Sequence, residues 1–175
     1  MKHVSEIMAE TLDRHGLTRR ASLHFGGACE PQNPGGVATA GWLVPVAGEI
    51  IAEGAEVVCE GAGATNNVAE YHAFGRGLKW VAGQVSELAA LGVVAIDCFG
   101  DSQLVVEQVA GRWRCNKPHL EKLRDRCREL LSQIRSLGIA IDVAWVPRDE
   151  NELADALSRS AYEAHTGKTF SARRR

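Results

Sequence analysis

The stretch ASLHFGGACEPQNPGGVATAGWLVPVAGEIIAEGAEVVCE, residues Ala21–Glu60, decides the fold of this chain. Apolar and polar side chains alternate along Ala21–Cys29, which predicts a half-buried strand. A dense turn signal at residues 31–36 separates this strand from a second one over Val37–Val46. A short turn then leads to a third strand over Glu49–Glu60. Three strands joined by short turns predict an antiparallel meander.

Helical and strand patterns alternate along the rest of the chain. An apolar stripe that begins after Thr65 or Asn66, either of which can cap it, predicts a helix to about Leu91. The later predicted elements are, in order, a strand over Val93–Phe99, a helix opening at Gln103–Ala110, a helix over His119–Leu137, a strand over Ile139–Val146 and a helix over Glu150–His165. Because helices precede each of the last two strands, both should lie parallel to the first strand. The pattern predicts an α/β layer architecture with one mixed sheet.

Length and composition fit one globular domain. The chain has 175 residues, 45% hydrophobic and 24% charged, which excludes collagen-like and disordered classes. No apolar run approaches the roughly 20 residues of a membrane-spanning helix. We expect a leader over residues 1–20 that forms at most a weak helix. The domain should cover residues 21–166, and a basic, frayed tail should cover residues 167–175.

The cysteines and the net charge limit which metals, disulfides and nucleic-acid contacts we expect. The five cysteines are scattered singly, which argues against disulfide partners and a zinc site. With no secretory signal in view, we expect a cytoplasmic protein, and we expect a monomer. The formal net charge is −2, so any nucleic acid must be contacted through a local patch or through metal ions. In the segment after Asp101, the only basic cluster is Arg112–Arg114 with Lys117.

Three acidic residues lie where the predicted backbone turns. Glu70 is in the first turn of a helix, Asp101 follows the end of a strand, and Asp155 lies on the last helix. Catalytic groups of open sheets gather at such strand ends and helix starts. Three converging carboxylates could not all stay ionised without a cation, and hard oxygen ligands suit Mg²⁺ or Mn²⁺.

Taken together, these blocks resemble a type 1 ribonuclease H of the archaeal and bacterial subgroup. The resemblance covers about Ala21 to His165. The matching stretches are FGGACEPQNPGG at Phe25–Gly36, TNNVAEY at Thr65–Tyr71, GDSQLV at Gly100–Val105, QVAGRWRCNKP at Gln108–Pro118 and WVPRDENELADALSR at Trp145–Arg159. The resemblance implies the ribonuclease H-like three-layer fold, with a five-stranded mixed sheet between helices.

The resemblance also implies an activity, namely endonucleolytic hydrolysis of the RNA strand of an RNA–DNA hybrid. Family members use two Mg²⁺ or Mn²⁺ ions and leave 5′-phosphate and 3′-hydroxyl ends. Glu70, Asp101 and Asp155 match three of the four metal-binding acids, and Glu70 would also read the RNA 2′-hydroxyl. Arg148 stands where some members place a mobile histidine that helps the product to leave.

Five polar residues match the family's substrate contacts. Asn33, Asn67 and Gln103 correspond to residues that contact the minor groove, where an amide can both donate and accept hydrogen bonds. Thr65 and Asn66 correspond to a pocket for a phosphate of the DNA strand, at a helix N-terminus. The main alternative is that Asn33 and Thr65 serve only turn and cap chemistry.

The sequence departs from the family at Gly26. The family's first strand ends in an aspartate followed by glycine, whereas this chain has Gly26-Gly27. The missing aspartate is the residue that normally bridges both metals, so we expect cleavage to be attenuated or abolished. Affinity for a second ion should fall sharply with it.

Three interpretations of Gly26 stay open. It is an engineered inactivating change, or a natural loss that leaves a non-cleaving hybrid-binding module, or another group compensates for it. The nearest candidates to compensate are Glu30, Asp97 and His24, and a water could fill the space. A resolvase or integrase core of the same superfamily fits less well, because Asn33 and Thr65–Glu70 suit an RNA strand.

Overall fold

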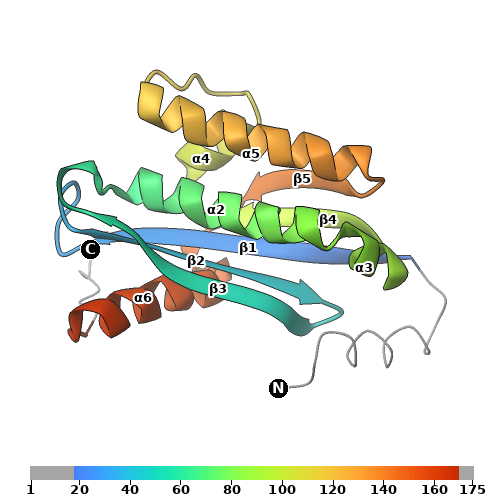
Figure 1. Ribbon diagram of the computed structural model, residues 1–175, viewed down its shortest axis with the longest axis horizontal. Coiled ribbons are helices and arrows are strands. Elements are labelled where there is room, and N and C mark those ends of the chain that lie inside the picture. The colour runs from blue at the N-terminus through green and yellow to red at the C-terminus, as the bar shows by residue number, and fades with distance from the viewer. Residues whose placement is uncertain (1–17, 170–175) are drawn as a thin grey trace.

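A five-stranded mixed sheet forms the middle layer of the molecule (Figure 1). The computed structural model describes residues 18–169. The strands are β1 (Arg19–Glu30), β2 (Val37–Val46), β3 (Glu49–Glu60), β4 (Val93–Gly100) and β5 (Ala140–Trp145). Their order across the sheet is β3-β2-β1-β4-β5. The first three pair antiparallel, and β4 and β5 continue parallel to β1, which confirms the predicted meander and the two parallel crossovers.

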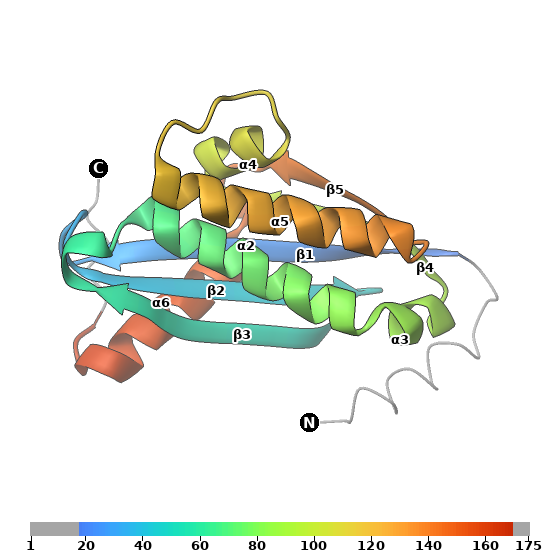
Figure 2. The ribbon, with the colours of Figure 1, turned by 45° about the horizontal axis from the view of Figure 1, so that its top comes forward.

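Helices cover both faces of this sheet. Figure 2 shows α2 and α5 side by side on one face, with α6 on the other. The helices are α2 (Asn66–Gly83), α3 (Val85–Ala90), α4 (Gln103–Val109), α5 (Pro118–Ser136) and α6 (Glu152–Thr166), with 3₁₀ turns η1 (Gly61–Gly63) and η2 (Arg148–Glu150). The predicted three-layer ribonuclease H-like fold is therefore confirmed.

Two helix predictions need correction. The helix predicted to reach Leu91 ends at Gly83, because the Gln84 N–H bonds to the Val81 carbonyl and breaks the α-helical ladder. The short α3 then follows as a separate element. The last helix begins at Glu152 rather than at Glu150, because residues up to Glu150 form the turn η2 and Asn151 has a non-helical φ of −120°.

The alternation of β1 positions both the core and the site. Leu23 and Phe25 point toward α2, where Phe25 stacks on Phe74 with ring centroids 4.3 Å apart. Gly77 of α2 lies over Leu23, where an added Cβ would approach a leucine methyl carbon to 2.5 Å. Residues of the opposite parity, including Gly26, face α6. The central strand is thus buried from both sides.

Several expectations concern residues outside the described range. The predicted leader helix and the end of the basic tail involve residues 1–17 and 170–175, which lie outside it. All five cysteines lie inside it, and all are free thiols. Within residues 18–169, no helix is long and apolar enough to cross a membrane.

Candidate active site

Two neighbouring glycines inside β1, Gly26 and Gly27, face opposite layers. An added Cβ at Gly27 would lie 2.5 Å from the backbone nitrogen of Glu70, so the close approach of α2 requires glycine there. At Gly26 the nearest atoms would be Asn151 Nδ2 at 3.4 Å and the Asp155 backbone nitrogen at 3.5 Å. These are ordinary van der Waals distances, so packing leaves room for a side chain at Gly26.

Glu70 is the fifth residue of α2, so it begins the second turn rather than lying in the first turn as predicted, and it is on the face toward β1. The helix starts where predicted, because Thr65 Oγ1 accepts a hydrogen bond of 3.1 Å from the Val68 N–H. The Glu70 carboxyl is buried, and its Oε2 has no hydrogen-bond partner. Burial raises the pKa of Glu70 well above its usual range, and the facing carboxylates of Asp101 and Asp155 raise it further. The backbone amide of Gly27 only partly opposes this rise.

Asp101 follows the end of β4 and is held by a residue that the sequence analysis missed. The Asn151 Nδ2 group donates to Asp101 Oδ1 at 2.9 Å and to the Phe25 carbonyl at 2.8 Å. Asn151 is buried and sits between η2 and α6. It thereby ties the α6 N-terminus to β1 and to Asp101. Its signal in the sequence was its place four residues before Asp155, within the stretch that matched the family.

Asp155 is buried in α6 and carries two arginine partners. Arg148 donates to both of its carboxylate oxygens, at 3.1 Å from Nη2 and 3.3 Å from Nε, and Arg159 also pairs with it. Burial lowers the pKa of Arg148, but the carboxylates, Asp155 foremost, outweigh it and leave that pKa raised. Arg148 therefore faces the acidic centre.

The donor set matches a divalent cation in chemistry, but it is incomplete. The three carboxylates come from three elements, supply hard oxygen donors, and include one buried oxygen without a partner. Within residues 18–169, however, no three His, Cys, Asp or Glu side chains are arranged to hold a metal ion. Arg148 and Arg159 form ion pairs with the oxygens of Asp155. Gly26 has no side chain that could supply the family's fourth carboxylate.

None of the three residues that could replace the missing acid, Asp97, His24 and Glu30, lies beside Gly26 with a free side chain. Both carboxylate oxygens of Asp97 bind Arg20, at 2.5 and 2.9 Å. The His24 Nε2 atom lies 3.1 Å from Ser22 Oγ, and burial lowers the pKa of His24. Glu30 is the last residue of β1, four positions beyond Gly26.

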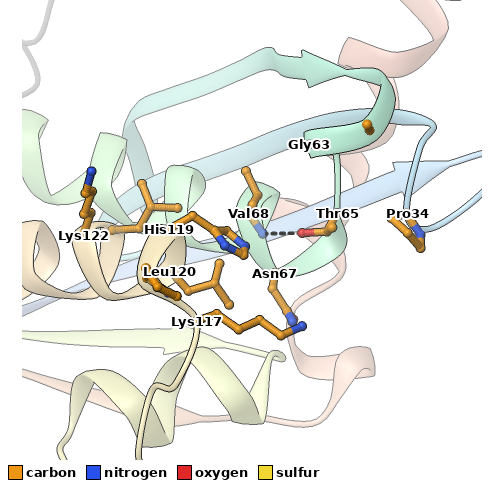
Figure 3. A pocket seen from close by; sticks show the side chains of 12 residues that line it. Pro34, Gly63, Thr65, Asn67, Val68, Lys117, His119, Leu120 and Lys122 are labelled. Carbon is orange, nitrogen blue, oxygen red and sulfur yellow. Dashed lines mark hydrogen bonds between the residues drawn. The ribbon is translucent and has the colours of Figure 1, made fainter.

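Four of the five predicted substrate contacts gather around the start of α2. Asn33 Oδ1 accepts from the Asn66 N–H at 3.1 Å, which joins the loop after β1 to this helix. Thr65 and Asn67 line a cavity of about 950 Å³ that opens beside them (Figure 3). Gln103 stands apart, exposed at the first position of α4, which Ser102 caps.

Comparison with known proteins places this chain in a family. A family profile described as "Reverse transcriptase-like" matches residues 25–161. Ribonuclease HI of Halobacterium salinarum is 39% identical over 151 residues, which make up 86% of this chain and 67% of that protein.

Solved structures agree with the sequence matches. The N-terminal RNase H domain of a Mycobacterium tuberculosis protein superposes with a TM-score of 0.68 at 34% identity, covering 86% of this chain and 98% of that one. RNase H1 of Halobacterium salinarum gives a TM-score of 0.67 at 37% identity, covering 83% and 98%. The chain spans about a quarter of the length of the full mycobacterial relative, a bifunctional protein.

Proposed function

This chain belongs to the type 1 ribonuclease H family, and on that premise we propose that it acts on RNA–DNA hybrids through the centre at Glu70, Asp101 and Asp155. The proposed reaction is endonucleolytic hydrolysis of the RNA strand, with 5′-phosphate and 3′-hydroxyl ends. The catalytic unit is the domain over residues 21–166. The observation that carries the proposal is the buried Glu70 carboxyl with a partnerless oxygen, facing two further acids.

Each residue of the centre has a proposed task. Glu70, Asp101 and Asp155 would hold Mg²⁺ or Mn²⁺, which supplies a water nucleophile at neutral pH and stabilises charge on the leaving oxygen. Glu70 also accepts a hydrogen bond from the 2′-hydroxyl, the group that distinguishes ribose from deoxyribose. Asn151 fixes the Asp101 side chain. Arg148, released from Asp155, contacts the phosphate and assists departure of the product.

The proposed substrate contacts lie around this centre. Asn67, one turn before Glu70 on α2, and Asn33 offer amides to the minor groove, and Gln103 does so from α4. Thr65 and Asn66 receive a phosphate of the DNA strand at the N-terminus of α2, where the helix dipole favours negative charge.

Gly26 should attenuate or abolish cleavage. A single oriented electrostatic group is commonly worth about 10²–10³ in rate, and a ligand shared by two metals should be worth at least as much. Because a Cβ fits at Gly26 and would point toward Asp155, the variant Gly26→Asp should complete the centre.

Cleavage of an end-labelled RNA–DNA hybrid by the native chain and by Gly26→Asp tests this proposal, in Mg²⁺ and separately in Mn²⁺. We expect Gly26→Asp to cut at least 10²-fold faster than the native chain. The matched control, Gly26→Asn, has the same shape without the charge and should stay at the native rate. Adding Asp101→Asn to Gly26→Asp should remove the gain. Equal rates for all variants, or cleavage of RNA–RNA duplex, would contradict the proposal.

The second candidate is a module that binds hybrids without cutting them. The pairing of Asp155 with Arg148 and Arg159 favours it, because those arginines already neutralise an acid that the reaction needs. This candidate predicts hybrid binding of equal strength in EDTA and in Mg²⁺, and no cleavage even by Gly26→Asp.

A further inference from the structure

Asn151 uses only the nitrogen of its buried side-chain amide. The Nδ2 group donates to the Phe25 carbonyl at 2.8 Å and to Asp101 Oδ1 at 2.9 Å. A carbonyl and a carboxylate oxygen can only accept, so the amide nitrogen must be the atom that faces them. The amide oxygen, Oδ1, therefore points the other way, and within residues 18–169 it has no hydrogen-bond partner.

An unpartnered oxygen at this depth is unfavourable. The side chain of Asn151 is almost completely buried, with 1% of the residue exposed. A polar atom that loses its hydration and gains no partner destabilises the fold, so buried amides are normally bonded through both their nitrogen and their oxygen. Because the same amide holds Asp101, a donor at Oδ1 would also restrain an acid of the proposed centre.

His24 lies on the face of β1 where this amide is found. Side chains two residues apart in a strand share a face, so His24 points to the same side as Gly26. On that side a Cβ at Gly26 would lie 3.4 Å from Asn151 Nδ2. Burial lowers the pKa of His24, and a side-chain interaction with Asn151 partly opposes this shift. Only a hydrogen-bond acceptor favours the protonated ring in this way, so the ring approaches the oxygen of the amide.

The other contacts of His24 fix the orientation of its ring. The ring packs against Phe99 at an angle of 46°, with centroids 5.3 Å apart, and its Nε2 atom lies 3.1 Å from Ser22 Oγ. Since Ser22 occupies Nε2, the nitrogen left for Asn151 is Nδ1. In a neutral imidazole one nitrogen donates and the other accepts. A donating Nδ1 therefore requires that Nε2 accept from the Ser22 hydroxyl.

We propose that His24 is a positioning residue for Asp101, acting as the Nδ1–H tautomer that donates a hydrogen bond to Asn151 Oδ1. The proposed chain of bonds runs from the Ser22 hydroxyl through the imidazole to the Asn151 oxygen. It continues from the Asn151 nitrogen to the Asp101 carboxylate. By fixing the amide in one orientation, it holds Asp101 toward the other two acids of the centre. The consequence for catalysis rests on the proposed function, whereas the tautomer does not.

NMR of the native chain labelled with ¹⁵N-histidine tests the tautomer without metal or substrate. At pH 8 the ring of His24 should show a protonated Nδ1 and an unprotonated Nε2, and its signals are identified by their absence in His24→Asn. Ser22→Ala removes the proposed donor to Nε2 and should increase the fraction of the Nε2–H form. A native ring protonated at Nε2 would overturn the inference, because its Nδ1 could then only accept.

Cleavage kinetics in the Gly26→Asp background test the positioning of Asp101. Adding His24→Phe removes both ring nitrogens but keeps an aromatic ring, and kcat should fall roughly threefold to tenfold with KM for the hybrid unchanged. Adding His24→Asn, whose amide can donate from the place of Nδ1, should restore most of the lost kcat. The matched control His72→Phe replaces another half-buried histidine, on α2, and should change neither kinetic constant.

The outcomes separate this inference from the proposed function. If Gly26→Asp does not cut, the proposed function fails, and the tautomer of His24 decides the inference. If Gly26→Asp cuts and His24→Phe leaves kcat unchanged, or raises KM instead, His24 does not position Asp101 and the inference is overturned. Should His24→Phe fail to fold, Ser22→Ala takes its place, and kcat should then fall in step with the fraction of the Nδ1–H form.

Discussion

At the scale of single residues, the acidic centre lacks a carboxylate at Gly26 and keeps a buried carboxyl at Glu70. Gly26 is buried on the α6 side of β1, next to Asn151 and Asp155, and nothing in the packing requires glycine. Glycine is unfavourable in a strand interior, so neither packing nor strand preference explains it at this position. Meanwhile two arginines compensate Asp155, and Glu70 remains buried with a raised pKa.

The variant Gly26→Asp should be less stable than Gly26→Asn without metal. Both side chains have the same shape, but the aspartate adds a fourth carboxylate to the centre, and like charges there repel. A penalty of about 1 kcal/mol would lower Tm by roughly 2–4 °C in a chain of this size. Differential scanning calorimetry in EDTA measures it, and 10 mM Mg²⁺ should reverse the order. A higher Tm for Gly26→Asp in EDTA would refute this electrostatic account.

At the scale of elements, α2 and α6 pack closely against glycines of the sheet, and this packing positions their acidic residues. An added Cβ at Gly27 would lie 2.5 Å from the Glu70 nitrogen, and one at Gly41 of β2 would lie 2.4 Å from the Ala154 carbonyl oxygen. These two contacts involve backbone atoms, which cannot rotate away as a side chain can. The close approaches therefore fix the depth at which Glu70 and Asp155 sit over the sheet.

Alanine at the two neighbouring glycines should have opposite effects on stability. Gly27→Ala must push α2 away from β1 and should cost about 1–3 kcal/mol, as overpacking does. Gly26→Ala meets only ordinary contacts and should be neutral or stabilising by about 0.5–1 kcal/mol. Urea denaturation of the two variants provides the comparison. Equal losses would mean that the helix and strand are not as close as described.

At the scale of the whole molecule, burial shifts the pKa values of titratable groups in several elements. Burial lowers the pKa of His24, which lies on β1, and of His72, which lies on α2. Glu56 partly opposes the shift at His72, and Arg76 adds to it. Each histidine therefore binds a proton less tightly in the folded chain than in the unfolded one. Glu70 behaves in the opposite way, because its raised pKa favours the protonated form.

The free energy of unfolding should consequently respond to the two histidines in mild acid. As the pH falls below about 6.5, the unfolded chain takes up more protons at His24 and His72, so their contribution destabilises the fold. The double variant His24→Asn/His72→Asn should lose less stability than the native chain between pH 7.5 and 5.5. Urea titrations measure this, and differences between chains cancel the Glu70 contribution.

Local pattern was enough to predict most of the fold. Alternation along Ala21–Cys29 predicted the central strand and its two faces, and helical spacing predicted α5 within two residues at each end. The order of elements then implied the parallel pairing of β4 and β5, because helical crossovers have few solutions. The break at Gly83 escaped prediction because an apolar stripe can continue across two helices.

The candidate acids, too, follow from motif and order in the sequence, as does the gap at Gly26. Only the tertiary structure decided their partners. Asn151 bonds to Phe25 and to Asp101, which lie 126 and 50 residues away along the chain. Arg148 and Arg159 are only seven and four residues from Asp155. Sequence periodicity reports how a residue relates to its near neighbours along the chain. Which charges meet across the layers depends on how those layers close, and that is decided by packing.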